Sequence, residues 1–135
     1  MPLKYLLDTD TCVYYLKGIE TVVNAFKEVE QEELAISQIT LAELQFGAFN
    51  SEQVERNLQR VDFFESSISV VLLDSAITRE FAKQKAKLRK TGKSLDDFDL
   101  FIGATALVGE LTLVTNNTKH FERIEGLVLQ NWSVC

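Results

Sequence analysis

Acidic and amide side chains lie next to several short apolar stretches of this 135-residue chain. They are Asp8, Asp10, Glu43, Asp96, Asp97, Asp99, Asn116 and Asn117. If the apolar stretches are parallel strands, their carboxyl ends share one edge, where such sheets place their sites. Carboxylates gathered there raise one another's pKa unless they bind a hard cation such as Mg2+ or Mn2+. A cation held in this way polarises phosphate and activates water, so the pattern predicts phosphodiester hydrolysis without a histidine or cysteine nucleophile.

Most of these side chains also have a purely structural interpretation. Asp8 is placed to cap the helix expected after it. Glu43 stands three residues after Thr40, which is the spacing of a capping box. Asn116 or Asn117 is a typical helix-cap or turn residue. Taken singly, these positions indicate helix ends as readily as chemistry, so the functional prediction rests on their shared place beside the strand ends.

Asp99 is harder to explain as a cap, because it lies inside the helix expected over about 97–109. Its face of that helix continues with Gly103 and Ala106. Such small side chains allow another element to approach closely. We therefore expect Asp99 to line a crevice rather than a free surface.

Short apolar stretches alternate with amphipathic ones along the whole chain. Strands are predicted at 4–8, 34–37, 69–73, 111–115 and 127–130. Helices are predicted at 11–18, 22–29, 40–49, 51–66, from Asp74 or Ser75 to Gly92, at about 97–109, and at 118–123. Nearly continuous apolar strands separated by helices indicate a parallel sheet covered on both faces. The prediction is one α/β domain over 1–135, a three-layer sandwich with a mostly parallel central sheet of about five strands.

Composition agrees with a globular domain, since 46% of the residues are hydrophobic and 25% are charged. No apolar run approaches the length of a membrane span, and the N-terminus lacks the apolar region of a signal peptide. Cys12 and Cys135 are the only cysteines, with no spacing typical of a disulfide framework or a zinc site. We therefore expect a cytoplasmic protein with no membrane partner.

The net charge of −6 argues at first against a nucleic-acid partner. The basic residues are unevenly distributed, however, and half of the 14 lie within fifteen residues. They are Arg79, Lys83, Lys85, Lys87, Arg89, Lys90 and Lys93. Alone, such a run indicates a solvated helix face. It becomes informative only where other features point to an anionic substrate.

Three sequence blocks resemble the PIN-domain family, and specifically its bacterial toxin branch, usually called VapC. They are LLDTD near the start, ITLAEL in the centre, and DFDLFIGATAL followed by LTLVTNNTKHFERIEGL. The resemblance runs from Leu6 to Trp132, and its last block is the most specific. It implies a metal-dependent endoribonuclease that cuts structured RNA, often tRNA, and is silenced by a cognate antitoxin. It also implies a homodimer.

Carried over residue by residue, the resemblance makes Asp8, Glu43 and Asp99 the first three acidic positions of the site. Asp8 and Asp99 would be the main Mg2+ ligands, with Mn2+ as a possible substitute, and Glu43 would bind the metal directly or through water. The fourth acidic position falls in VTNN, where we align Asn117 rather than Asn116. An amide adds no negative charge, which disfavours a tightly held second metal.

The resemblance gives the remaining features a use as well. The basic run at 79–93 would steer RNA, and the acidic remainder would face a basic segment of an antitoxin. Thr9 and Thr115 would help to position phosphate or water. Apolar residues at 19–26 and 40–49 would contact either the antitoxin or a second copy of the chain, and the sequence does not distinguish the two.

Two other interpretations remain open at this point. Asp8-Thr9-Asp10-Thr11 after an apolar strand fits the motif of haloacid-dehalogenase-like phosphatases, with Asp8 as the nucleophile. That interpretation leaves Glu43 without a role. The other is a non-catalytic PIN-like module that binds RNA or protein. The two enzymes differ at Asp8, which the phosphatase would phosphorylate, whereas the nuclease would use it only to bind metal.

Overall fold

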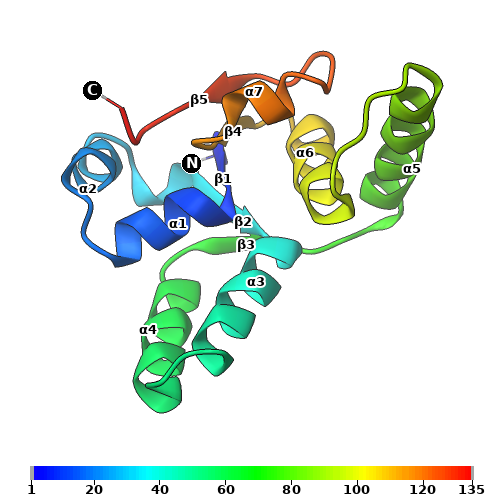
Figure 1. Ribbon diagram of the computed structural model, residues 1–135. Helices are drawn as coiled ribbons and strands as arrows, with labels where there is room; N and C mark the ends of the chain where they lie inside the picture. The colour runs from blue at the N-terminus through cyan, green and yellow to red at the C-terminus, as the bar shows by residue number, and fades with distance from the viewer. Residues whose placement is uncertain (1, 135) are drawn as a thin grey trace.

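A computed structural model describes residues 2–134, so Met1 and Cys135 lie outside the described part. Its centre is a five-stranded sheet in the order β3-β2-β1-β4-β5 (Figure 1). The strands are β1 (Tyr5–Leu7), β2 (Leu34–Ser37), β3 (Ser69–Val71), β4 (Thr112–Val114) and β5 (Leu129–Gln130). Every pair of neighbouring strands is parallel. The predicted five-stranded parallel sheet is therefore confirmed.

Seven α-helices and one short 3-10 helix connect these strands in the described residues. They are α1 (Thr9–Leu16), α2 (Glu20–Lys27), η1 (Gln31–Glu33), α3 (Gln38–Phe49), α4 (Val54–Ser66), α5 (Ser75–Lys90), α6 (Asp97–Gly109) and α7 (Thr118–Phe121). In Figure 1, α5 and α6 lie side by side, away from the α3–α4 pair. None of the helices described in 2–134 has both the length and the apolar content to cross a bilayer.

The sheet is buried on both faces because its central strands alternate side chains between two separate clusters. Leu6 of β1 and Leu113 of β4 pack with residues of α5, α6 and α7. The neighbouring Leu7 and Val114 pack on the other side with residues of α1, α3 and α4. Both leucines of β1 are fully buried. The predicted three-layer α/β sandwich follows directly from this alternation.

The chain reverses its direction of travel across the sheet at β1. It runs from β1 outward through β2 to β3, and then returns to place β4 on the opposite side of β1. The two crossovers leave β1 and β4 in opposite directions, which opens a crevice outside their carboxyl ends. Residues that follow β1 and β4 therefore meet at this point.

Gly103 allows the segment after α7 to lie directly on α6, as its small size predicts. A Cβ at this position would stand 2.5 Å from Cδ1 of Ile124, which is buried. We expect Gly103→Val to lower the free energy of unfolding by about 2 kcal/mol. Gly47 in α3 is the matched control because nothing lies within 4 Å of its Cβ position. Gly47→Ala should raise stability by up to about 1 kcal/mol, and urea unfolding of both variants tests the contrast.

Candidate active site

Asp8 directly follows β1 and bonds to the residue that directly follows β4, at the point where the strand order of the sheet reverses. Its side chain is 6% exposed. One carboxylate oxygen accepts a hydrogen bond from the backbone N–H of Thr9 at 2.8 Å, which makes Asp8 the N-cap of α1. The other oxygen accepts from Oγ1 of Thr115, directly after β4, at 2.7 Å. The cap interpretation of Asp8 is therefore correct, but it accounts for only one of its two oxygens.

Asp10 belongs to the same group of side chains, although the family resemblance assigns no role to it. Its Oδ2 accepts from the backbone N–H of Asn116 at 3.0 Å and lies 3.4 Å from Oγ1 of Thr115. Asp8 and Asp10 thus hold the segment after β4 from two sides. Their shared partner Thr115 is fully buried.

The pKa of Asp8 is raised from its ordinary value of 3.8 to about 7, mainly because the carboxyl group is buried. The negative charges of Asp10 and, to a smaller extent, Asp99 contribute to this rise, and the hydrogen bonds from Thr115 and Thr9 oppose it. Within residues 2–134, no lysine, arginine or histidine forms a salt bridge with Asp8. A buried carboxylate without a cationic partner is costly in its charged form, and a bound cation removes that cost.

Asp99 lies in the first turn of α6 and faces the short helix α7. Its Oδ2 is 3.1 Å from Nε2 of His120, and both side chains are about one quarter exposed. Burial and the charges of Asp96 and Asp10 raise the pKa of Asp99, and His120 lowers it, with a net rise. Asp99 is therefore partly buried against α7 and lies within electrostatic reach of Asp8 and Asp10.

Sequence reasoning missed His120 as part of this site. The residue was visible as the only histidine of the chain, placed just after the polar end of β4. Its Nε2 contacts one of the two carboxylate oxygens of Asp99. His120 therefore helps to fix the orientation of Asp99.

The capping-box interpretation of Glu43 is wrong, because α3 begins earlier than Thr40. Its N-cap is Ser37, whose Oγ accepts from the backbone N–H of Thr40 at 3.0 Å. Glu43 thus lies in the second turn, where its Oε1 accepts from Oγ1 of Thr9 at 2.6 Å. This bond connects α3 to the first residue of α1, directly beside Asp8.

The two asparagines after β4 differ in their contacts. The Asn116 side chain bonds outward, to Tyr14 and to the segment at 131–133. Asn117 is the N-cap residue of α7 but makes no side-chain capping bond, and its backbone N–H donates to Thr115 at 3.0 Å. Neither side-chain amide forms a hydrogen bond with a site carboxylate in the described structure. The assignment of Asn117 to the fourth position stays a prediction.

The site offers a divalent cation two carboxylates and not a complete set of protein ligands. In the described range 2–134, no three acidic, histidine or cysteine side chains are arranged to hold a metal together. Glu43 is turned toward Thr9, whereas Asp8 lies within electrostatic reach of both Asp10 and Asp99. Of these two, Asp99 is the position that the family resemblance assigns to the metal. Mg2+ is commonly bound by one or two carboxylates with water in the remaining positions, so this donor set suits it.

Comparisons with known proteins agree with this architecture. A family model described as PIN domain matches residues 5–127. The chain is 37% identical over 131 residues to the tRNA(fMet)-specific endonuclease VapC of Shigella flexneri, covering 97% of this chain and 99% of that protein. It is 35% identical over 130 residues to ribonuclease VapC2 of Rickettsia felis, covering 95% and 97%.

Solved structures resemble the whole chain as well. The structure of VapBC2 from Rickettsia felis bound to a promoter DNA fragment matches with a TM-score of 0.89 and 34% identity, over 96% of this chain and 99% of that one. The DNA-bound VapBC from Salmonella typhimurium matches with a TM-score of 0.91 and 35% identity, over 96% and 98%. The similarity thus extends over nearly the whole chain.

Proposed function

This chain belongs to the VapC branch of the PIN-domain family, and we propose that it is a divalent-metal-dependent endoribonuclease that acts in the cytoplasm. Membership of the branch supports ribonuclease activity. The observation that carries the metal requirement is the buried Asp8, which lies near Asp10 and Asp99 and forms no salt bridge with a cationic side chain in the described part of the chain. Family membership also removes the haloacid-dehalogenase interpretation.

In this proposal Asp8 and Asp99 hold Mg2+, or Mn2+ in its place. When bound, the cation polarises the scissile phosphate and lowers the pKa of a water molecule for in-line attack. Thr115 and Thr9 fix the Asp8 carboxylate through the two bonds described above, and His120 fixes Asp99. The burial of Asp8 keeps bulk water away from one side of the pair.

Glu43 supports the site from α3 in this proposal. Its bond to Oγ1 of Thr9 places its carboxylate one residue from Asp8, so it is positioned to accept hydrogen bonds from water at the site. Asn117 would contribute an amide oxygen or an N–H donor at the opposite rim, without adding charge. Three carboxylates and one amide then surround the reacting phosphate.

Structured RNA, and tRNA in particular, is the proposed substrate. The support is the name of the Shigella flexneri relative, a tRNA(fMet)-specific endonuclease, together with the length over which the two chains match. Folded RNA presents a dense array of phosphates, and metal-carboxylate chemistry acts on phosphates without reading a base. The identity of the cleaved RNA is therefore set by surfaces outside the carboxylate pair.

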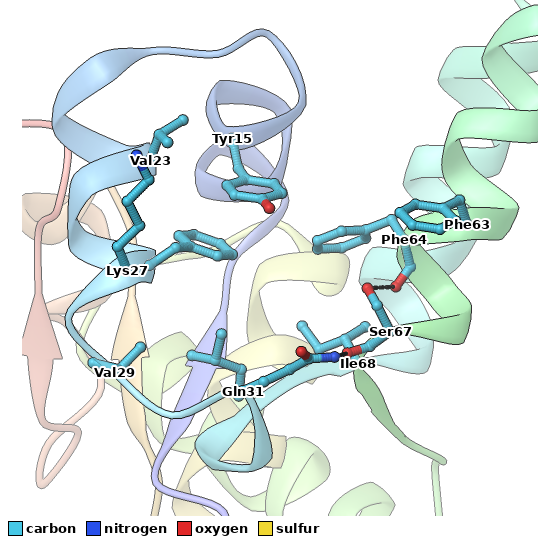
Figure 2. A pocket seen from close by; sticks show the side chains of 11 residues that line it. Tyr15, Val23, Lys27, Val29, Gln31, Phe63, Phe64, Ser67 and Ile68 are labelled. Atoms are coloured by element: carbon cyan, nitrogen blue, oxygen red, sulfur yellow. Dashed lines mark hydrogen bonds between the residues drawn. The ribbon is translucent and has the colours of Figure 1, made fainter.

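A cognate antitoxin is the proposed protein partner, because the structural relatives include toxin–antitoxin complexes. An apolar pocket of about 450 Å3 lies between α2 and α4. Figure 2 shows Val23 and Lys27 on one wall, Phe63 and Phe64 on the other, and Tyr15 between them. Phe63 is 76% exposed, so this surface offers aromatic area to a partner. We expect the antitoxin segment that binds this pocket to be amphipathic and basic, because the pocket is apolar and the chain has a net charge of −6.

The helix at 38–49 also presents aromatic side chains that the sequence placed on an apolar face. Phe46 and Phe49 are 67% and 65% exposed, so neither belongs to the core of the chain. We assign this second surface to a homodimer contact. Sedimentation of the antitoxin-free protein tests it, because Phe46→Ser with Phe49→Ser should convert a dimer to a monomer.

Purified protein free of antitoxin should cut total bacterial RNA at discrete positions in Mg2+ or Mn2+, and EDTA should stop the cutting. Sequencing of the new ends should place most of them in tRNA. Cuts that fall mainly in messenger RNA would contradict the substrate assignment. A folded protein that cuts no RNA under any of these conditions would instead support the non-catalytic binding module.

A further inference from the structure

A polar hollow of about 590 Å3 lies between the loop after α5 and the turn of chain that contains α7. It is lined by Gly92, Lys93, Ser94, Lys119, Glu122 and Arg123. Three cations and one carboxylate therefore face a single depression on a chain whose net charge is −6. We call this depression the basic hollow.

The cations of the basic hollow are available to a ligand. Within residues 2–134, none of Lys93, Lys119 and Arg123 forms a salt bridge. Three members of the basic run on α5 are paired instead, Lys83 with a glutamate at 3.9 Å, Lys85 with an aspartate at 2.9 Å and Lys87 with a glutamate at 3.1 Å. The run predicted from sequence is therefore partly neutralised along α5, whereas its last lysine, Lys93, lines the basic hollow.

The shape of the basic hollow is held by a direct bond across it. Nη1 of Arg123 donates to the backbone carbonyl of Ser94 at 2.6 Å, which ties the loop after α5 to the turn after α7. Lys119 lies in α7 and Arg123 two residues beyond its end, and both line the basic hollow. The two walls thus present their charges toward the same space.

The basic hollow borders the carboxylate site through α7. His120, the residue after Lys119, contacts Asp99 at 3.1 Å, and Ser94 lies five residues before Asp99 along the chain. We propose that the basic hollow binds the phosphodiester backbone of the RNA substrate beside the scissile phosphate. This proposal rests on the ribonuclease function proposed above, and it names where the RNA lies on the chain.

The physical reason is that Lys and Arg contacts to phosphates fix the position of a nucleic acid without reading its sequence. They also release counterions, so each contact adds to the salt dependence of binding. A strand held in the basic hollow would approach Asp8 and Asp99 along α7, with its charge neutralised on a protein surface that is otherwise acidic.

The test compares two double variants that remove equal charge. Lys93→Gln with Lys119→Gln acts on the basic hollow, and Lys4→Gln with Lys17→Gln removes two exposed lysines away from the carboxyl edge of the sheet. Binding of a labelled tRNA transcript is measured in EDTA by fluorescence anisotropy over a range of KCl concentrations. We expect the hollow variant to weaken binding at least about 10-fold and to reduce the slope of log Kd against log salt by about 0.7–0.9 per lost contact. The control variant should keep the wild-type slope.

A hollow variant with the wild-type slope would overturn the proposal, including the case in which the basic hollow binds only free phosphate. Cleavage in Mg2+ gives a second readout, in which the hollow variant should raise KM with little change in kcat. A large fall in kcat with unchanged KM would show distortion of the site and would also overturn it. Wild-type protein that neither binds nor cuts tRNA would contradict the proposed function instead.

Discussion

Asp99→Asn is expected to lower the rate of RNA cleavage by at least about 1000-fold, which corresponds to about 4 kcal/mol of lost transition-state stabilisation. The change removes one of the two carboxylates proposed to hold the metal and keeps the size of the side chain. An asparagine amide can still bond to His120, so α6 and α7 should stay in contact. The measurement is the single-turnover rate of tRNA cleavage in saturating Mg2+.

Asp97→Asn is the matched control for this prediction. Asp97 lies in the same turn of α6, but it is exposed and forms its salt bridge with Lys85 at 2.9 Å, away from the site. Surface salt bridges contribute little to stability, so the variant should cut RNA at close to the wild-type rate. Equal losses of the cleavage rate in both variants would contradict a specific role of Asp99 as a metal ligand. They would mean that cleavage depends only on the total negative charge at the start of α6.

Asp8→Asn is expected to stabilise the metal-free protein at pH 8 while abolishing cleavage. The unfolded chain ionises Asp8 near pH 3.8, whereas the folded chain holds its proton until about pH 7. Between these values the folded state binds more protons, so stability falls as the pH rises. A difference of this size corresponds to roughly 4 kcal/mol at pH 8. Asparagine carries no charge and avoids this cost, but its hydrogen bond with Thr115 is weaker. The net gain in the free energy of unfolding should therefore be about 2 kcal/mol.

Urea unfolding in EDTA at pH 4.5 and pH 8 measures this effect. The gain from Asp8→Asn should be present at pH 8 and largely absent at pH 4.5, where the wild-type carboxyl is already neutral in the folded state. A variant that is less stable than wild type at pH 8 would show that the carboxylate is satisfied by its two hydrogen bonds. The case for a cation at Asp8 would then lose its main support.

The sheet was predictable because its strands are short, apolar and regularly separated. Four of the five predicted strands extend one or two residues beyond the observed ones, whereas 34–37 is observed as predicted. The face of Gly103 and Ala106 correctly predicted a close approach, and Asp74 caps α5 through a 2.9 Å bond to the N–H of Ile77. Such features follow from local spacing, which a single sequence contains.

The partners of the site residues were not predictable in the same way. Glu43 bonds to Thr9, 34 residues away, and Asp99 contacts His120, 21 residues away. Both contacts depend on how neighbouring helices pack on one face of the sheet. Local spacing instead favoured a capping box for Glu43, which is wrong because α3 starts at Gln38. Phe46 is exposed, in agreement with the prediction that apolar residues at 40–49 contact a partner, but which partner binds there does not follow from one sequence.

Binding of Mn2+ to the metal-free protein tests most directly whether Asp8 and Asp99 together hold a divalent cation. Electron paramagnetic resonance of free Mn2+ during titration counts the bound ions. The wild type should bind about one ion per chain, Asp8→Asn and Asp99→Asn should each lose that binding, and Asp97→Asn should retain it. Undiminished Mn2+ binding by Asp99→Asn, or RNA cleavage by a wild-type protein that binds no Mn2+ or Mg2+, would contradict the account.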